Sequence, residues 1–475
     1  MKKIIPLALT YDDVLIIPRR STFTSRKEAV TTTKLTKKIN LHIPLVSANM
    51  DMVTGEAMAV TLARLGGIGI VHRFMTIEDN AAVIRRVKRA QNLIISDPYT
   101  IDPTATVREV KQKVEILGVS GLLIANGDRK LRGVISSRDL VFATHDDQLV
   151  QEIMTPFEKL VVAEKGVTFT EAKYIMAQKK IEKLPIINKD GEIEGLVTMS
   201  DIQHLGQYPH ANVDQHGQLI VGGAVGVQGD YLERAQELVK AGVDVIVVDI
   251  AHGHSDLMFR AIEKLREVCG SVELIVGNIA TATAAEELCA AGVDAIKVGV
   301  GPGTTCITRL VTGCGVPQLT AVMECAEVAK KYNTPVIADG GIQKSGDIVK
   351  AIGVGADTVM IGGLFAGTTE SPGRVMSRGD KKYKVYRGSA SFDVSEKRKN
   401  LGLEKKDLQD VVPEGVESVV PFKGPLADIV AQLVGGLRSG MSYTNAHSIA
   451  ELQEVAEFVQ ITNAGMRESG AHDIG

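Results

Sequence analysis

The stretch that decides the fold runs from residue 219 to residue 303: LIVGGAVG (219–226), DYLERAQELVKAG (230–242), VDVIVVDIAHG (243–253), SDLMFRAIEKLREVCG (255–270), VELIVGN (272–278), TATAAEELCAAG (281–292) and VDAIKVGVGPG (293–303). Short apolar runs alternate in it with amphipathic stretches, which predicts repeated strand–helix units. The runs are rich in Val and Ile on both faces, and this is typical of parallel strands that are buried on both sides.

The same alternation continues on either side of this stretch, with IPLVSANMD (43–51) and IGIVHRF (68–74) before it and TPVIADGG (334–341) and ADTVMIGG (356–363) after it. Eight such units predict a TIM (β/α)8 barrel, in which the active site lies at the carboxyl ends of the strands. Polar or small residues occupy these ends: Asn49, Asp249, Asn278, Cys306, Asp339 and Gly362. A doubly wound sheet is the alternative, although it more often has one dominant glycine fingerprint near its start.

Residues 93–205 interrupt this alternation with an internal repeat. LLIANGDRKLRGVISSRDL (122–140) and LPIINKDGEIEGLVTMSDI (184–202) align at an offset of 62 residues (184 against 122), and each copy is predicted to form strand, turn, strand and helix. The pair resembles a tandem cystathionine-β-synthase (CBS) module, also called a Bateman module. We therefore expect a barrel built from residues 1–92 and 206–475, with a regulatory module of residues 93–205 inserted in it.

The CBS resemblance implies a function for one aspartate in each copy. Asp139 and Asp201 end the pattern S/T-x-x-D, and in CBS modules this position holds the ribose of a regulatory nucleotide, here expected to be ATP or GTP. The same pattern also caps helices, so both readings remain open.

Composition excludes several classes of partner. The formal net charge is −3, from 54 basic and 57 acidic side chains, and this argues against a protein that binds nucleic acid or a membrane surface. No segment reaches the ~18 uninterrupted apolar residues of a membrane span. The five cysteines are odd in number and have no CxxC spacing, a pattern typical of a reducing compartment. We expect a cytoplasmic protein that acts on small molecules.

The segment VGVGPGTTCITR (298–309) places a lone cysteine, Cys306, in a glycine-rich loop after a predicted strand. A thiolate attacks electrophilic carbon, and the free backbone amides of such loops hold phosphate. The loop therefore predicts covalent chemistry on a phosphorylated substrate. Cysteine statistics alone leave a packed, inert thiol as the alternative.

Ten motifs follow one another in a fixed order: YDDVLIIP (11–18), SANMD (47–51), GGIGIVHR (66–73), GPGTTC-TR (301–309), TG-GVPQ (312–318), IADGGI (337–342), AGTTESPG (366–373), YRG (386–388), VPEG (412–415) and GGLRS (435–439). In this order and over nearly the whole chain, the sequence resembles the IMP dehydrogenase and GMP reductase family. The resemblance implies that Cys306 attacks C2 of a purine nucleotide and forms a covalent thioimidate, with Thr308 and Glu414 as further catalytic residues.

The resemblance also implies the binding residues. Asp339 would hold the ribose hydroxyls, Ser389 and Ala390 would contact the base, and the phosphate would be held by Thr304, Gly341, Gly362, Gly363 and Tyr386. The nicotinamide cofactor would contact Asp249, Ala251 and Asn278. A potassium ion would be held by main-chain oxygens of Gly301, Gly303 and Cys306 and by the tail of a neighbouring subunit, Glu468, Ser469 and Gly470. The family forms homotetramers, which in some members pair into octamers.

The two activities of the family differ in the flap, residues 388–414. Dehydrogenases activate water there with an Arg-Tyr pair, but this flap has no Tyr, and Asn400 and Leu401 occupy the expected places. Arg398 lies close by, and Val411 stands where many reductases have Arg. We therefore expect an NADPH-dependent GMP reductase that converts GMP to IMP and ammonia. An IMP dehydrogenase with an atypical flap is the alternative, and a regulator that has lost catalysis is a third reading.

Overall fold

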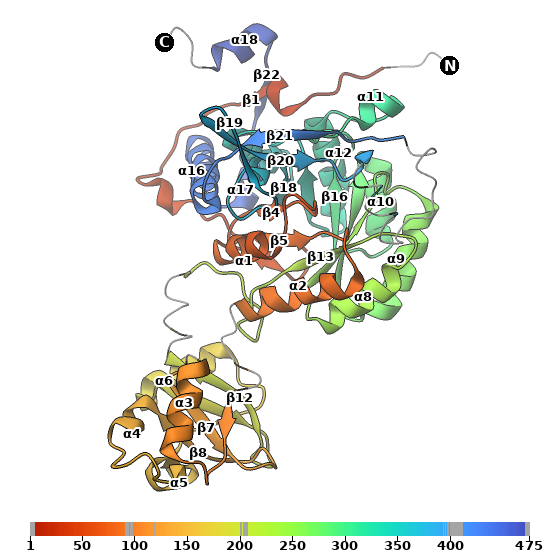
Figure 1. Cartoon of the computed structure of the whole chain (residues 1–475). Helices are drawn as coiled ribbons and strands as arrows, with labels where there is room; N and C mark the ends of the chain where they lie inside the picture. Colours follow the sequence, from red (N-terminus) through yellow and green to blue (C-terminus); the bar gives the residue numbers. More distant parts are fainter. Residues whose placement is uncertain are drawn as a thin grey trace. The chain divides into compact units, whose positions relative to one another are not determined.

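The computed structural model describes residues 5–90, 95, 98–117, 119–199, 202, 208–392, 394, 396, 399 and 412–470. The chain divides into two compact units (Figure 1). The first, called the barrel unit below, comprises residues Met1–Ala90, His210–Asn212 and Leu219–Gly475. The second, called the repeat unit, comprises Gln91–Pro209 and Val213–Gln218.

The barrel unit contains a closed barrel of eight parallel strands, which confirms the predicted TIM barrel and excludes the doubly wound sheet. Its strands, in order around the barrel, are β13 (Gly222–Val225), β14 (Val245–Asp249), β15 (Glu273–Ile279), β16 (Ala295–Val298), β17 (Val336–Asp339), β18 (Thr358–Ile361), β4 (Leu45–Ser47) and β5 (Ile68–Val71). The two strands that precede the repeat unit in the sequence thus close the barrel between β18 and β13.

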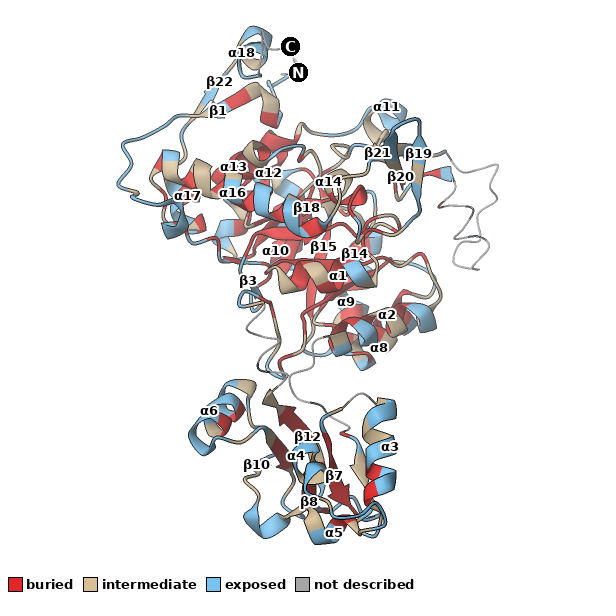
Figure 2. Cartoon of the chain, turned by 60° about the vertical axis from the view of Figure 1, so that its left-hand side comes forward, coloured by how far each residue is buried: buried red, intermediate tan, exposed pale blue. Residues whose placement is uncertain are grey.

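Amphipathic helices surround these strands: α1 (Glu56–Arg64), α2 (Ile77–Ala90), α8 (Tyr231–Lys240), α9 (Asp256–Cys269), α10 (Ala282–Ala290), α12 (Gln318–Lys331), α13 (Ser345–Gly353) and α16 (Leu426–Thr444). Helix α10 begins at a side-chain cap, where Thr281 accepts a hydrogen bond from the amide of Ala284. In Figure 2 the buried residues follow the strands and the inner faces of the helices, whereas the outer faces are exposed.

Apolar side chains fill the interior of the barrel. Ile70, Val247, Ile275 and Ile337 are fully buried in one cluster, although they come from four different strands. Such branched side chains pack in layers inside a parallel barrel and leave no channel through it. The barrel is therefore a rigid base, and function is confined to its rim.

Shorter elements complete the barrel unit. At the amino end lie η1 (Tyr11–Asp13), β1 (Val14–Ile16), η2 (Arg26–Glu28), β2 (Thr33–Lys34) and β3 (Asn40–Leu41); later come α11 (Thr308–Thr312), α14 (Gly363–Ala366), β19 (Val375–Arg378), β20 (Lys381–Arg387), β21 (Glu417–Pro421), α17 (Ile449–Val455), β22 (Phe458–Gln460) and α18 (Asn463–Glu468). Strand β1 pairs with β22, so the two ends of the chain meet in one small sheet (Figure 1). Strands β19, β20 and β21 form an antiparallel sheet at the base of the flap.

The repeat unit contains β6 (Thr100–Ile101), α3 (Val107–Leu117), β7 (Gly121–Ala125), β8 (Leu131–Ser136), α4 (Ser137–Val141), α5 (Val150–Ile153), β9 (Thr155–Pro156), η3 (Phe157–Lys159), β10 (Ala163–Glu164), α6 (Phe169–Lys179), β11 (Lys183–Ile187) and β12 (Ile193–Thr198). The pairs β7–β8 and β11–β12 begin and end 62 residues apart (183 against 121, 198 against 136). Their registers also shift at equivalent places, between Ile124 and Ala125 and between Ile186 and Ile187. The sequence repeat is thus a structural repeat.

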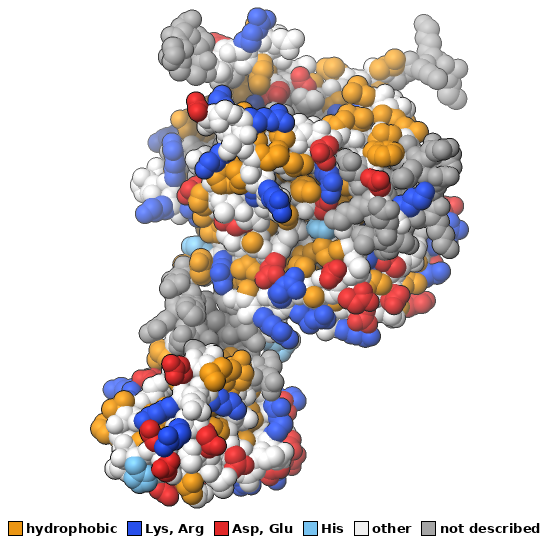
Figure 3. Space-filling view, in the orientation of Figure 1, with side chains coloured by type: hydrophobic (Ala, Val, Ile, Leu, Met, Phe, Trp, Pro, Cys, Tyr) orange, Lys and Arg blue, Asp and Glu red, His pale blue; other side chains and the backbone are white. Residues whose placement is uncertain are grey.

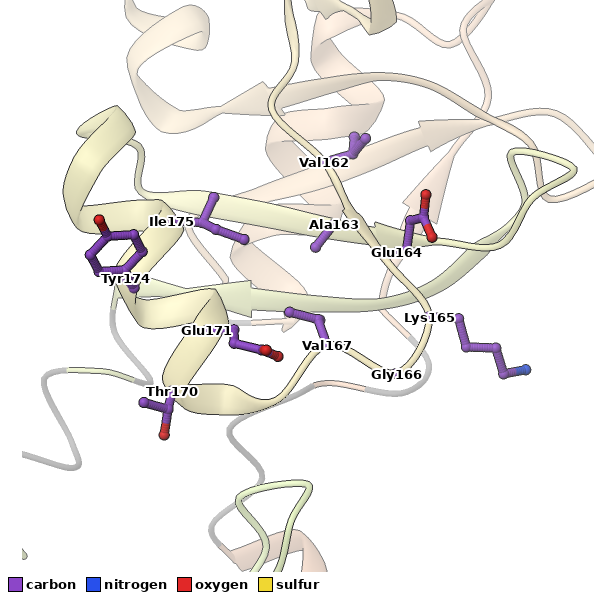
Figure 4. A pocket seen from close by; sticks show the side chains of 10 residues that line it. All are labelled: Val162, Ala163, Glu164, Lys165, Gly166, Val167, Thr170, Glu171, Tyr174 and Ile175. Carbon is purple, nitrogen blue, oxygen red and sulfur yellow. The ribbon is translucent and has the colours of Figure 1, made fainter.

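The surface gives no sign of a large one-signed patch on the face shown in Figure 3, where basic and acidic side chains are interspersed. Among the residues that the structure describes, no helix is long and apolar enough to cross a membrane.

Candidate active site

A cavity of about 270 Å3 lies at the carboxyl ends of the barrel strands. It is lined by all six residues that the sequence places at these ends: Asn49, Asp249, Asn278, Cys306, Asp339 and Gly362. The prediction that strand ends gather functional groups is therefore confirmed for this barrel.

The cysteine lies in the loop between β16 and α11. Its amide donates a hydrogen bond to the carbonyl of Gly303 at 3.1 Å, which closes the loop into a tight turn. Cys306 is partly exposed to the cavity, and its Sγ lies 3.2 Å from Oγ1 of Thr308. Thr308 in turn donates a hydrogen bond of 2.7 Å to Oε2 of Glu414. These three side chains form a continuous hydrogen-bonded line from the sulfur to a carboxylate.

Glu414 is far from Cys306 in sequence, and the backbone brings it to the loop. The carbonyl of Glu414 accepts from the amide of Ile307 at 2.8 Å, and the amide of Glu414 donates to the carbonyl of Ala390 at 3.0 Å. Next to it, the amide of Val416 donates to the carbonyl of Thr305 at 3.0 Å. The segment after the flap is thus fastened directly to the cysteine loop, so the Thr308–Glu414 contact is fixed by main-chain bonds on both sides.

A carboxylate and a buried glutamine organise the opposite wall. Asp339, the last residue of β17, accepts a hydrogen bond on Oδ2 from the side-chain amide of Asn278 at 2.9 Å. Gln318 donates through Nε2 to the carbonyls of Val298 (2.8 Å) and Asp339 (3.2 Å). Because Val298 ends the strand that leads into the cysteine loop, Gln318 fixes this loop and the end of β17 relative to each other.

A buried lysine joins the residues beneath the cavity. The ammonium of Lys297, which is 1 % exposed, lies 2.7 Å from Asp249 and 2.7 Å from Asp339, and it also bonds Oδ1 of Asn278. The side-chain amide of Asn49 donates to the second oxygen of Asp249 at 2.9 Å. Burial by itself raises the pKa of Asp249, but the Lys297 charge and these hydrogen bonds outweigh it and hold this pKa below its usual value.

The charge state of this cluster follows from its geometry. Burial disfavours the ammonium of Lys297, yet the two carboxylates overcome burial and raise the pKa of Lys297. The cluster therefore carries two anionic groups and one cation. The single cation Lys297 forms ion pairs with both Asp249 and Asp339, and so stabilises the carboxylates on both walls of the cavity.

Uncharged donors gather in another part of the cavity, around Gly362 and Tyr386. A Cβ atom on Gly362 would lie 2.7 Å from the hydroxyl of Tyr386, and one on Gly363 would lie 3.1 Å from Oγ1 of Thr304. Burial raises the pKa of Tyr386 to about 12, so its hydroxyl stays protonated. The hydroxyl donates to the thioether of Met50 at 3.8 Å, which is a weak acceptor. A protonated hydroxyl, a threonine and bare glycine amides together suit an anion.

Comparison with known proteins now decides the family. The family model described as the IMP dehydrogenase / GMP reductase domain matches residues 8–472. The chain belongs to this family. It is 50 % identical to a GMP reductase of Leishmania donovani (99 % of this chain, 98 % of that one) and 48 % identical to an inosine-5′-monophosphate dehydrogenase of Nitrosopumilus maritimus (98 % and 98 %).

A solved relative is similar along its whole length. A cysteine-to-alanine variant of Trypanosoma brucei GMP reductase in complex with guanosine 5′-monophosphate has a TM-score of 0.85 at 48 % identity, covering 99 % of both chains. The same enzyme in complex with guanosine 5′-triphosphate has a TM-score of 0.74 at 44 % identity, covering 97 % of this chain and 99 % of that one. Identity alone does not separate the two activities of the family, because relatives of both kinds match almost equally well.

Most residues that the family resemblance singled out lie around this cavity. In addition to those named above, its lining includes Ala251, Gly301, Gly303, Thr304, Thr308, Gly341, Gly363, Tyr386, Ser389, Ala390 and Glu414. Glu468, Ser469 and Gly470 are not among the residues that line it; they lie at and just beyond the end of α18. Their role in a cation site stays a prediction.

The repeat unit bears on the two readings of its aspartates. Asp139 accepts hydrogen bonds from the amide and the hydroxyl of Ser136, both at 2.7 Å, so it caps α4 in this structure. Only Oδ2 of Asp139 makes these contacts, and ribose binding stays a prediction. Asp201 lies outside the described residues, as do the flap positions Arg398, Asn400, Leu401 and Val411.

Sequence reasoning missed Lys297 and Gln318. A signal for Lys297 was present, because it is the one charged residue in the apolar strand AIKV (295–298), and a lysine buried in a barrel strand needs anionic partners. Gln318 gave no comparable signal, since its two acceptors lie at the ends of different strands and come together only in the folded barrel.

Proposed function

We propose that this protein is an NADPH-dependent GMP reductase, which converts GMP to IMP and ammonia through a covalent intermediate on Cys306. The observation that carries the proposal is the hydrogen-bonded line from Cys306 through Thr308 to Glu414. Such a line can move a proton between a carboxyl group and a group that reacts next to the sulfur. The GMP reductases among the relatives support this assignment.

The reaction follows from the order of these groups. The thiol of Cys306 passes its proton through Thr308 to Glu414, the thiolate adds to C2 of the guanine base, and Glu414 returns a proton through Thr308 to the 2-amino group. The C2–N bond then breaks, ammonia leaves, and a thioimidate remains on Cys306. Hydride addition to C2 and cleavage of the C–S bond release IMP and restore the thiolate. One hydride and the protons taken up balance the loss of the amino group as ammonium.

The remaining residues orient the nucleotide. Asp339 would accept the ribose hydroxyls, since the described bonds occupy only its Oδ2 atom. The amides of Gly362 and Gly363 and the hydroxyl of Tyr386 would hold the phosphate. Thr304 and Gly341 would add donors, and the backbone of Ser389 and Ala390 would contact the base. Asp339 would thereby set the distance between C2 and the sulfur.

The nicotinamide cofactor supplies the hydride when it is bound. Asp249, Ala251 and Asn278 line the side of the cavity where it would lie, and the relatives support a nicotinamide cofactor. NADPH is the form that we propose. Asp249 and Asn278 are pre-oriented by Lys297, so this side of the cavity needs no rearrangement of its polar groups.

We also propose a potassium ion at the cysteine loop, held by main-chain oxygens of Gly301, Gly303 and Cys306 and by Glu468, Ser469 and Gly470 of a neighbouring subunit. Uncharged carbonyl oxygens suit such a cation. The carbonyl of Gly303 already accepts from the amide of Cys306, and a carbonyl has a second lone pair that remains for the ion. This arrangement requires a homotetramer, and octamers formed from two tetramers are part of the proposal.

The repeat unit is proposed to be a tandem CBS module that binds ATP or GTP and changes activity or assembly. The strands of its two copies begin and end at equivalent positions, and their registers shift at equivalent positions, which supports the tandem arrangement. The GTP complex of the Trypanosoma brucei enzyme favours a guanine nucleotide. Asp139 and Asp201 would hold the ribose, for which Asp139 has to exchange its capping bonds with Ser136. All five cysteines are free thiols, which supports a cytoplasmic location.

The flap decides between reduction and oxidation. Residues 388–414 contain no tyrosine, so the Arg-Tyr pair by which the dehydrogenases activate water is missing from the sequence. Without an activated water, the thioimidate is left for the hydride donor. This favours the reductase over the IMP dehydrogenase alternative.

The test compares both directions in one preparation. The purified protein with GMP and NADPH should lose absorbance at the NADPH band and release one ammonia per NADPH consumed. With IMP and NAD it should form little NADH. Rapid NADH formation from IMP, with no ammonia from GMP, would assign the protein to the dehydrogenases. Cys306→Ala should abolish turnover in either case.

A further inference from the structure

A second buried lysine, Lys384, lies close to the proposed phosphate site. It belongs to β20, two residues before Tyr386, and both side chains are buried whereas Lys382 is exposed. Alternate residues of a strand point to the same face and lie about 7 Å apart. The ammonium of Lys384 and the hydroxyl of Tyr386 are therefore carried on the same side of the strand.

A cage of uncharged oxygens surrounds this ammonium. Its Nζ donates to the carbonyls of Thr368 (2.8 Å) and Ser371 (2.6 Å), with the carbonyl of Thr369 and the hydroxyl of Ser371 at 3.4 and 3.2 Å. In the part of the chain that the structure describes, none of its hydrogen-bond acceptors is a carboxylate. Lys384 is only 2 % exposed, so its charge is shielded from water.

Other buried lysines show what is unusual here. Lys297 bonds two carboxylates, and Lys88 bonds both oxygens of Asp244 at 2.9 and 2.8 Å. Lys384 instead bonds main-chain carbonyls and a hydroxyl, which carry only partial charges. Burial accordingly lowers the pKa of Lys384, and the negative charge of nearby Glu370 offsets this only in part. A buried cation without a bonded anion is unfavourable by itself and is stabilised when an anion binds near it.

The cage is continuous with the proposed phosphate site. Its residues follow α14 directly, and α14 begins at Gly363 next to Thr304 and Tyr386. Ser371 donates to the carbonyl of Ala366 at 2.6 Å, so the cage and the end of α14 form one hydrogen-bonded unit. By holding this unit against β20, Lys384 fixes the distance between the glycine amides of α14 and the hydroxyl of Tyr386.

None of the residues proposed to hold the phosphate has a positively charged side chain. The basic residues that line the cavity are Arg73 and Lys297, and Lys297 is neutralised by Asp249 and Asp339. Thr304, Gly362, Gly363 and Tyr386 contribute uncharged donors only. A phosphate dianion held by them alone would be a buried double charge without a countercharge.

We propose that Lys384 is a positioning residue that supplies the buried countercharge for the 5′-phosphate of the substrate and so sets the preference for a nucleoside monophosphate. The proposal rests on the proposed binding of a purine monophosphate at this cavity. Lys384 does not touch the phosphate; it acts through the electrostatic potential and through the cage that orients α14 and β20.

The experiment measures the dissociation constants of GMP and IMP by calorimetry, together with KM and kcat. Lys384→Gln keeps donors for the cage and removes the charge. It should weaken nucleotide binding about 30-fold, because the attraction between the buried ammonium and the phosphate is lost. It should leave kcat within about twofold, because Lys384 does not contact the reacting atoms. Lys384→Arg should restore most of the affinity. The matched control is Lys382→Met on the same strand, which should bind as the wild type does.

A further variant avoids any change to the cage lysine. Glu370→Gln removes the opposing charge and keeps an acceptor for the amide of Leu426, which now bonds Glu370 at 2.8 Å. It should tighten GMP binding about threefold, and it decides the question if Lys384→Gln does not fold. Thermal unfolding of every variant shows which ones fold.

Two outcomes overturn the proposal: wild-type affinity in Lys384→Gln, or an equal loss in Lys384→Arg and Lys384→Gln. If the wild type oxidises IMP with NAD and does not reduce GMP, the proposed reaction is wrong, but the binding measurements on Lys384 still stand.

Discussion

Replacing Lys297 with methionine tests the idea that one ammonium supports both walls of the cavity. The change keeps an unbranched side chain, shorter by one atom, and removes the charge. It leaves Asp249 and Asp339, which the ammonium now contacts at 2.7 Å each, as two partly exposed carboxylates without a cation. Breaking a fully buried ion pair by removing one partner costs about 3–5 kcal/mol, and solvent access to the carboxylates lowers this cost. We expect a loss of stability of about 3 kcal/mol or less and a clear fall in the unfolding temperature.

The effect on the substrate follows from the same loss. Without the ammonium, Asp339 loses the contact with Nζ of Lys297 that holds its carboxylate in place. A displaced Asp339 loses charge-assisted hydrogen bonds to the ribose, each worth about 1.5–3 kcal/mol. The dissociation constant of GMP should therefore rise by about a hundredfold. Calorimetric titration with GMP measures this directly.

The matched control is Lys88→Met. Lys88 is also buried and bonds a single carboxylate, Asp244, but neither residue lines the cavity. This variant should lose a similar amount of stability and bind GMP within about twofold of the wild type. The reasoning is refuted if Lys297→Met binds GMP normally, or if Lys88→Met weakens GMP as much.

The sign of the pH dependence adds a second test of Lys297. In the wild type the pKa of Asp249 lies below its unfolded value, so this group contributes stability above about pH 4 that is lost only as pH falls further. In Lys297→Met, burial is no longer outweighed and raises the pKa of Asp249, which reverses the sign, because the ionised form of Asp249 then costs stability as pH rises. The difference in unfolding temperature between variant and wild type should shrink from pH 8 to pH 5. A constant difference would contradict this.

Three further changes have distinct expected results. Cys306→Ala should bind GMP within about threefold of the wild type without turnover, and calorimetry with an ammonia assay checks both. Glu414→Gln should lower kcat at least about a hundredfold. Adding Thr308→Val should lower kcat little further, because both residues belong to the same hydrogen-bonded line. Additive losses of kcat in steady-state kinetics would contradict a shared role. Burial raises the pKa of Asp357 to about 6, so the wild type should lose about 3 kcal/mol of folding stability as pH rises from 4 to 7. Asp357→Asn keeps an acceptor for the amide of Val336 and removes the charge. In thermal unfolding it should be more stable than the wild type at pH 7 but not at pH 4.

The sequence was sufficient for the barrel because each strand is a local apolar run and each helix has its own polar and apolar faces. All eight predicted strands are present, from β4 to β18. The sequence also predicted the structural repeat of residues 122–140 and 184–202, because identical residue spacing gives strands and turns at equivalent positions in both copies. The strand ends that carry Asn49 and Asp339 followed from the geometry of any parallel barrel.

Tertiary structure decided the rest, because the interactions join residues that are distant in sequence. The contact of Thr308 with Glu414 depends on main-chain bonds between the cysteine loop and the segment after the flap. Lys384 gives no indication in KKYKVYR that it will enter a cage of carbonyls from residues 368–371.

The sequence by itself determined the barrel and the repeat and predicted a cysteine at the end of a barrel strand, since periodicity and residue type are local properties. Only the folded chain showed which charges compensate one another. Lys297 is shared between two carboxylates, whereas Lys384 bonds none among the residues that the structure describes. The physical reason is that the energy of a buried charge depends on every group within a few ångströms, and the fold alone fixes which groups those are.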